Sequence, residues 1–104
     1  MKEMILVICN NGSADDVMEA AKSKGARGGT ILHGRGSASK DAAKFLGFTI
    51  QPEKELIMII VDKEIRNPIM QEISSKHGVG TQAHAICLSI PVDATVGLNS
   101  VQTE

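Results

Sequence analysis

Two unbroken aliphatic runs, at residues 4–9 (MILVIC) and 56–61 (LIMIIV), constrain the fold of this 104-residue chain more than any other feature. Each run is short and rich in β-branched residues, which is typical of a buried strand. Apolar residues with helical spacing follow each run. The sequence therefore predicts two strands that each lead into a helix, in two halves of similar length.

The first helix is predicted over residues 13–24 from its apolar spacing and its two ends. Ser13 and Asp16 have the three-residue spacing of a capping box, and Gly25 supplies a C-terminal stop. One stripe follows the i, i+3, i+4, i+7 rule of an amphipathic helix, and its members are Ala14, Val17, Met18 and Ala21.

The second helix is predicted over residues 64–76, ending at Gly78, with an apolar face of Ile65, Ile69, Met70 and Ile73. Pro68 restricts where this helix begins, because proline lacks a backbone N–H and is best tolerated in the first turn. Two alternatives remain open. Either Asn67 caps a helix that starts at Pro68, or the proline lies at the edge of the first turn.

Three further extended segments complete the pattern. Residues 28–33 and 83–90 are predicted as strands, and residues 45–50 are expected to resume extended structure after a polar loop at 34–40. Two strand–helix–strand units joined by a loop match the α+β, ferredoxin-like βαββαβ fold. We therefore expect a single domain over residues 1–104, with a four-stranded antiparallel sheet and both helices on one face.

This arrangement leaves the second face of the sheet without a cover. A strand as apolar as residues 56–61 would then meet water, and large apolar patches on soluble proteins usually mark an interface. A second copy of the same face is the simplest cover. We therefore expect a homo-oligomer.

The composition excludes several classes of partner. A formal net charge of −1, no Trp or Tyr and two Phe argue against nucleic acid and against an anionic membrane surface. No apolar run approaches the ~20 residues of a membrane span, and the first strand is not preceded by a signal-peptide pattern. Cys9 and Cys87 lie in apolar runs, as expected for buried thiols of a reduced, cytoplasmic protein.

Two glycine-rich turns are the main candidates for a binding site. In Gly34-Arg35-Gly36, backbone N–H groups and an arginine fork could bind phosphate, although a flexible loop with a solvated arginine explains the triplet too. Gly78-Val79-Gly80-Thr81 could also hold phosphate, and a helix C-cap followed by a turn explains it equally well. Lys54 is either a phosphate contact or a strand-edge lysine. Across a subunit boundary the two turns could meet around one anion.

Other reactive side chains form no known constellation. His33, His77 and His84 match no common zinc spacing, and Ser37 and Ser39 lie outside any nucleophile-elbow motif. The Walker and dinucleotide-binding glycine motifs are also missing from the sequence. No catalytic residue and no metal ligand is therefore predicted, and the chain is not expected to be an enzyme.

The length, the strand order and the two glycine turns together resemble the PII nitrogen-regulatory proteins. The resemblance is distant and spans residues 3–92; its most telling stretch is residues 25–36, which has the form G-x-x-G-x-T, an apolar strand and G-R-G. Pro52-Glu53-Lys54 also resembles the segment before the family's third strand. Members of this family are ferredoxin-like homotrimers that bind ATP or ADP between subunits and regulate transporters, enzymes or transcription factors.

The resemblance implies a set of ligand-binding residues. Thr30, Gly34, Arg35 and the adjoining Gly36 would lie at the base of the family's long signalling loop, the T-loop, where nucleotide binds. Lys54 matches a ligand-contacting lysine of the family. The second phosphate-binding loop, the B-loop, corresponds to Gly78, Gly80 and Thr81.

The chain also departs from the family's pattern. Its loop at 37–46 is shorter than the T-loop and has no tyrosine to be uridylylated. Gly36 replaces the glutamine of the magnesium and 2-oxoglutarate site, and Thr81-Gln82-Ala83 replaces the B-loop's Asp-Gly-Lys. No arginine follows Arg66, so the C-terminal basic clamp is missing.

We therefore expect a cytoplasmic, non-catalytic, PII-like regulatory homotrimer that senses a small anion, with ATP or ADP as the first candidate. The loop at 35–46 would change order on binding and present a surface to a regulated protein, in nitrogen metabolism by analogy. The alternative is a metal-binding trimer of the CutA type that uses His33, His77 or His84. An acylphosphatase has the same strand order, but Asn10 and Asn11 have no arginine nearby.

Overall fold

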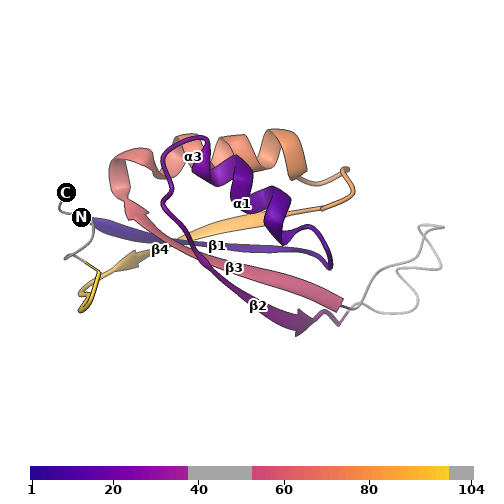
Figure 1. Ribbon diagram of the computed structural model, residues 1–104, viewed down its shortest axis with the longest axis horizontal. Coiled ribbons are helices and arrows are strands. Elements are labelled where there is room, and N and C mark those ends of the chain that lie inside the picture. The colour runs from indigo at the N-terminus through magenta and orange to yellow at the C-terminus, as the bar shows by residue number, and fades with distance from the viewer. Residues whose placement is uncertain (38–52, 99–104) are drawn as a thin grey trace.

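In the part of the chain that the structure describes, residues 1–37 and 53–98, two helices lie on one face of a four-stranded antiparallel sheet (Figure 1). The computed structural model has the strand order β2-β3-β1-β4. Its elements are β1 (Lys2–Asn10), α1 (Ala14–Lys22), β2 (Thr30–Arg35), β3 (Glu53–Asp62), α3 (Lys63–His77) and β4 (Ile86–Val92). The predicted ferredoxin-like α+β fold is confirmed.

The hydrophobic core fills the space between the helices and the central strands. Side chains along β1 alternate between buried and half-buried, because successive strand residues point to opposite faces. The stripe predicted for the first helix is buried in α1, which confirms its orientation toward the sheet. The largest fully buried side chains are Ile5, Val7 and Cys9 of β1, Ile57 and Ile59 of β3, Val17 of α1, and Ile69 and Ile73 of α3.

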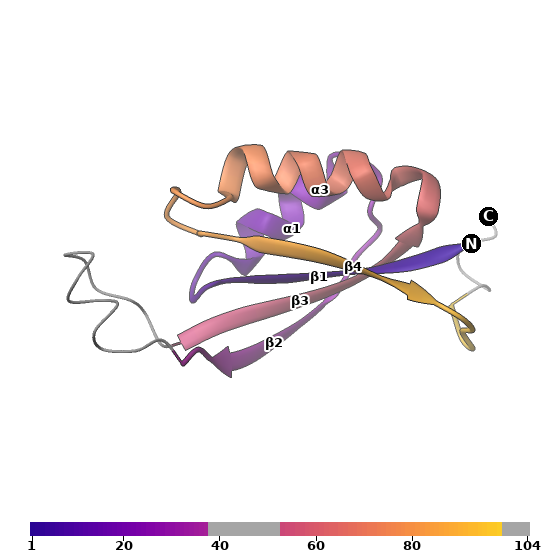
Figure 2. The same cartoon turned by 180° about the vertical axis from the view of Figure 1, so that it is seen from behind.

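The other face of the sheet is apolar, and no described element covers it (Figure 2). The strand registers align its side chains across the sheet; Leu6, for example, lies opposite both Met58 and Leu88. The exposed fraction reaches 43% at Leu32 and 49% at Ile86. We call this surface the open face; its aliphatic side chains are those of Met4, Leu6, Ile8, Leu32, Leu56, Met58, Ile60, Ile86, Leu88 and Ile90.

The start of α1 differs from the prediction. The helix covers Ala14–Lys22 rather than residues 13–24, and Ser13 makes no side-chain capping bond, so the capping-box prediction is wrong. Glu55 of β3 takes that role, because its Oε1 accepts hydrogen bonds from the backbone N–H groups of Gly12 and Ala14, at 2.9 and 2.8 Å. A carboxylate at a helix N-terminus also interacts favourably with the helix dipole.

The start of α3 also differs from both predicted alternatives. The helix begins at Lys63, directly after β3, and Pro68 lies inside it. Its first turn is held by tertiary contacts: Lys63 N–H donates to the Met1 carbonyl at 2.9 Å, and Arg66 Nη1 lies 2.9 Å from Glu3 Oε1. These contacts stabilise a turn of helix before the proline, which agrees with the predicted range 64–76 and not with either alternative for Pro68.

Two strands are shifted relative to the prediction. β2 begins at Thr30 rather than at residue 28 and continues through Arg35, which was predicted to be in a loop. β4 begins at Ile86 rather than at residue 83 and continues to Val92. The predicted extended segment at 45–50 and the loop residues 38–46, Ser39 included, lie outside the described residues.

Candidate functional site

Several of the predicted binding residues lie together at one end of the sheet, where β1 and β2 end and β3 begins. Lys54, near the start of β3, is paired with Gly34 of β2 on one side and with Asn10 of β1 on the other. Arg35 is the last residue of β2, lies opposite Glu53 and is exposed. The register places Gly34 opposite Lys54, and Arg35 is one position further along β2, where the strand alternation directs its side chain to the other face.

Lys54 is connected to the glycine-rich turn through one asparagine. Its Nζ donates a hydrogen bond to Asn10 Oδ1 at 2.7 Å, and Asn10 Nδ2 donates to the Gln82 carbonyl at 3.0 Å. The Asn10 backbone N–H donates to the Ala83 carbonyl at 2.9 Å. These hydrogen bonds thus hold the segment after α3 at the same end of the sheet as Lys54.

The turn formed by Gly78, Gly80 and Thr81 also has a structural explanation. A Cβ at Gly78 would overlap the carbonyl oxygen of Ser74, and Gly80 has φ +95°, which favours glycine. Thr81 Oγ1 donates to the Gly78 carbonyl at 2.7 Å and accepts from His84 N–H at 3.3 Å. Its hydroxyl is therefore already engaged within the turn.

Gly34 has a packing role on the open face. A Cβ there would lie 2.9 Å from Leu56 Cδ1, so the missing side chain gives Leu56 room across the strand pair. Gly36 follows the end of β2 and is half-buried, and it offers no side-chain ligand. Arg35 is thus the group in this triplet that can supply charge to a ligand.

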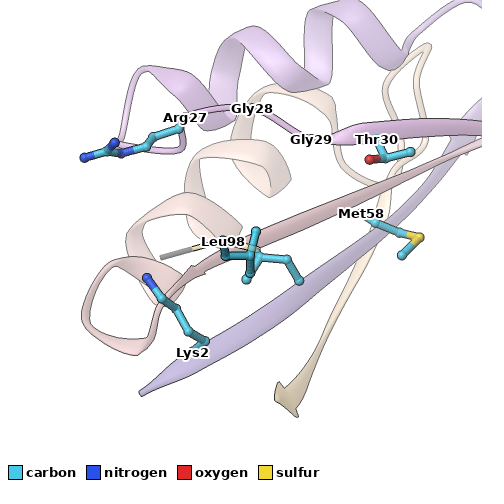
Figure 3. A pocket seen from close by; sticks show the side chains of 8 residues that line it. Lys2, Arg27, Gly28, Gly29, Thr30, Met58 and Leu98 are labelled. Carbon is cyan, nitrogen blue, oxygen red and sulfur yellow. The ribbon is translucent and has the colours of Figure 1, made fainter. Parts of the chain in front are cut away.

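Thr30 lies at the opposite end of β2 from Arg35. Five strand residues span about 17 Å, so within one chain the two side chains cannot contact the same small ligand. Thr30 is paired with Met58 and borders a cavity of about 290 Å³ (Figure 3). The other lining residues are Lys2, Arg27, Gly28, Gly29, Met58, Ile60 and Leu98.

Cationic side chains shape the electrostatics around this cavity. Lys2 Nζ lies 2.7 Å from Asp62 Oδ1, and its hydrogen bond, with its charge, lowers the pKa of Asp62 below the ordinary value. The more distant charge of Arg27 lowers that pKa in the same direction. Lys2 and Arg27 were not among the predicted binding residues, because Lys2 lies outside the motifs and Arg27 occupies an unspecified position of the G-x-x-G-x-T stretch.

The thiols and histidines give no sign of catalytic or metal chemistry in the described part of the chain. Burial raises the pKa of the thiols of Cys9 and Cys87 to about 11, so both are protonated at neutral pH. The described residues contain no group of three His, Cys, Asp or Glu side chains that could hold a metal ion. His33, His77 and His84 lie on β2, at the end of α3 and before β4 respectively.

Two solved structures share this open-faced, ferredoxin-like sheet. The structure is similar to that of a protein from Thermus thermophilus assigned as PII-like and signalling, with TM-score 0.61, 18% identity, and 86% of this chain and 85% of that one covered. It is also similar to Arabidopsis thaliana PII bound to citrate, with TM-score 0.64, 20% identity and coverages of 88% and 74%. The PII-like fold implied by the sequence is confirmed.

Sequence comparison adds nothing to this assignment. No protein-family model matches the chain, and no curated protein matches it significantly. Among the described residues, none of the helices has the length and apolarity needed to cross a membrane.

Proposed function

We propose that this protein is a PII-like regulatory module that binds a small anion, with an adenine nucleotide as the first candidate, in clefts between the subunits of a homotrimer. It has no catalytic activity of its own, acts in the cytoplasm and controls a partner protein in nitrogen metabolism. The similarity to PII-like structures supports the regulatory class. We call the cavity beside Thr30 and the strand ends with Arg35 and Lys54 the two half-sites. The observation that carries the proposal is their position at opposite ends of β2 and beside the open face.

The open face supports the trimer. Monomeric soluble proteins rarely expose a contiguous apolar surface of this extent. Three of the four strands contribute at least three aliphatic side chains each to it, and their exposure is highest on β4. Packing three copies of this face around one axis would bury these side chains without any further element.

The separation of Thr30 from Arg35 supports a site between subunits. In one chain the cavity beside Thr30 and the strand ends with Arg35 and Lys54 lie at opposite ends of β2. When neighbouring copies meet through the open face, the Thr30 end of one copy can face the Lys54 end of the next. The cationic residues are Arg27 and Lys2, the latter ion-paired with Asp62, on one side and Arg35 and Lys54 on the other.

The ligand chemistry follows from these charges. The chain as a whole is slightly acidic, with a formal net charge of −1, so the pairing of cations at both half-sites is a local feature. Arginine forks and lysine ammonium groups are the usual partners of phosphates and carboxylates. The citrate-bound Arabidopsis thaliana PII has a ligand of the same charge class.

The two ends of the segment between β2 and β3 border the proposed site. At its first end, Gly36 directly follows Arg35. At its second end, Glu53 directly precedes Lys54. A ligand that engages Arg35 and Lys54 therefore touches both ends of this segment. We propose that the segment carries the ligand signal to the partner protein.

Two measurements test the proposal. Sedimentation equilibrium at micromolar concentration should give three times the 11.0 kDa mass of one chain, and Leu88→Glu on the open face should give monomer. Thermal-shift titration with ATP, ADP, AMP, citrate and zinc should show a stabilising shift with nucleotide or citrate, about 2.7 kcal/mol at 100 times the dissociation constant. A monomeric wild type, or stabilisation by zinc alone, would contradict the proposal.

A further inference from the structure

At the end of β1, Asn10 forms hydrogen bonds through its side-chain carbonyl oxygen, its side-chain amide nitrogen and its backbone N–H. The carbonyl oxygen accepts from Lys54 Nζ at 2.7 Å, and the amide nitrogen donates to the Gln82 carbonyl at 3.0 Å. Its backbone N–H donates to the Ala83 carbonyl at 2.9 Å. One residue therefore joins the start of β3, the end of β1 and the turn after α3.

The location of this junction matters for ligand binding. Along β1, Asn10 continues the alternation of Met4, Leu6 and Ile8, so its side chain lies at the end of the open face. Lys54 is the register partner of Asn10 on β3 and lies on the same face. The hydrogen-bonded pair thus borders the surface through which a neighbouring copy would supply the second half of the site.

A neutral amide can orient a lysine side chain by a hydrogen bond without forming an ion pair with it. A carboxylate at position 10 would form an ion pair with Lys54 and reduce the attraction of the ammonium for an anionic ligand. The nearby Glu55 carboxylate does not take this role, because its Oε1 accepts from Gly12 and Ala14 on the helix side of the sheet. The side-chain hydrogen bond that orients Lys54 is therefore made to an amide and not to a carboxylate.

We propose that Asn10 is a positioning residue that orients the Lys54 ammonium toward an anionic ligand and couples it to the glycine-rich turn at 78–82. The inference rests on the proposed function, because it needs Lys54 to contact the ligand. It adds a residue that neither the motif nor the resemblance assigned. Asn10 acts on the ligand through Lys54 and through the Gln82 carbonyl, without contacting the ligand itself.

A double-mutant cycle in the full-length protein tests the first part, with ATP in the presence of magnesium, and separately citrate, as probes in calorimetry. Asn10→Ala should weaken binding about fivefold or more in the wild-type background and less than about twofold in a Lys54→Met background. Asn10→Asp should weaken it further than Asn10→Ala, because the carboxylate neutralises Lys54. The matched control is Asn11→Ala, which changes the next residue and should leave the affinity unchanged.

The outcomes separate this inference from the proposed function. Equal losses from Asn10→Ala in both backgrounds would show a general structural effect and overturn the positioning role, as would no loss in either. If the wild type binds neither probe, the proposed function fails and the ligand-directed part of the inference fails with it.

Hydrogen exchange, measured in the absence of ligand, tests whether Asn10 and Lys54 are coupled to the glycine-rich turn. The Thr81 and Ala85 amides donate to the Gly78 and His77 carbonyls, so their exchange reports on the turn. Asn10→Ala and Lys54→Met should both accelerate exchange at these amides relative to Asn11→Ala. Unchanged exchange in Lys54→Met would overturn the coupling of Lys54 to the turn.

Discussion

The Glu55 carboxylate caps helix α1 from across the fold, accepting the Ala14 backbone N–H at 2.8 Å. The same oxygen accepts the Gly12 N–H at 2.9 Å, so one side chain of β3 satisfies two donors at the start of the helix. Hydrogen bonds to a charged group contribute more than neutral ones. The beginning of β3 and the beginning of α1 therefore stabilise each other.

We predict that Glu55→Ala lowers the free energy of unfolding by about 1.5–3 kcal/mol, because two backbone donors lose a charged acceptor. Urea denaturation at a fixed protein concentration measures this loss. Glu53→Ala, two residues earlier on the same strand, is the control and should change stability by less than about 0.5 kcal/mol. A comparable loss in both variants would contradict the capping role of Glu55.

A second prediction concerns the pair formed by the buried Glu3 and the half-buried Arg66. The Glu3 side chain is only 6% exposed and lies 2.9 Å from Arg66 Nη1. Arg66→Leu should destabilise the fold by about 3 kcal/mol, because it leaves a buried carboxylate without its partner. Lys2→Leu breaks the more exposed pair with Asp62 and should cost less than about 1 kcal/mol. Equal losses in the two variants, measured by urea denaturation, would argue against this difference in burial.

A third prediction concerns Asp62 and pH. Its pKa is lowered in the folded state, first by the hydrogen bond from Lys2 and then by the charges of Lys2 and Arg27. The ionised form therefore adds stability above the ordinary carboxyl pKa, and this contribution is lost as the pH falls through the lowered value. The stability difference between wild type and Asp62→Asn should be present at pH 7 and shrink toward zero in strong acid. A stability difference that stays constant from pH 7 to strong acid would contradict the role of the Lys2–Asp62 pair.

The hydrophobic pattern was enough to predict the fold. The runs at 4–9 and 56–61 form the two central strands, and the apolar helix stripes face them. The errors lie where tertiary contacts decide the local structure. Ser13 has the spacing of a cap, yet Glu55 provides the acceptor, and Arg66 helps to hold a helical turn before Pro68. Local spacing cannot predict either contact, because each joins segments that are far apart in the sequence.

The candidate site was predicted less completely. The glycine triplet and Lys54 do lie together, because antiparallel pairing brings the end of β2 to the start of β3. Asn10 was considered for the acylphosphatase alternative and not for the anion site, and its contact with Gln82 spans 72 positions of the chain. An asparagine at the end of an otherwise aliphatic strand was the available signal, but it did not indicate the partner.

A fourth prediction concerns Arg35. It was expected in a solvated loop, and the structure places it as the exposed last residue of β2. Arg35→Ala should weaken ATP binding by about 1.5–3 kcal/mol, the contribution of a charge-assisted hydrogen bond. Folding should change little, because the side chain is exposed. Calorimetric titration of both proteins gives the affinities, and Lys22→Ala in α1 controls for the loss of one positive charge. Equal affinities of Arg35→Ala and wild type would remove Arg35 from the site.

The last prediction is that 2-oxoglutarate does not bind through a bridging magnesium ion, as the resemblance to standard PII proteins would otherwise suggest. In that family the metal is held by ATP phosphates, the oxo-acid and a glutamine side chain, and the matching residue here is Gly36, which has no side-chain oxygen. Magnesium requires near-ideal octahedral geometry, so the loss of one ligand should be severe. Titration of 2-oxoglutarate into protein saturated with MgATP should therefore show no magnesium-dependent heat at micromolar concentrations. Gly36→Gln restores a ligand at this position and is the matched variant. Magnesium-dependent binding by the wild type would show that another group, such as the exposed Ser37, replaces the missing oxygen.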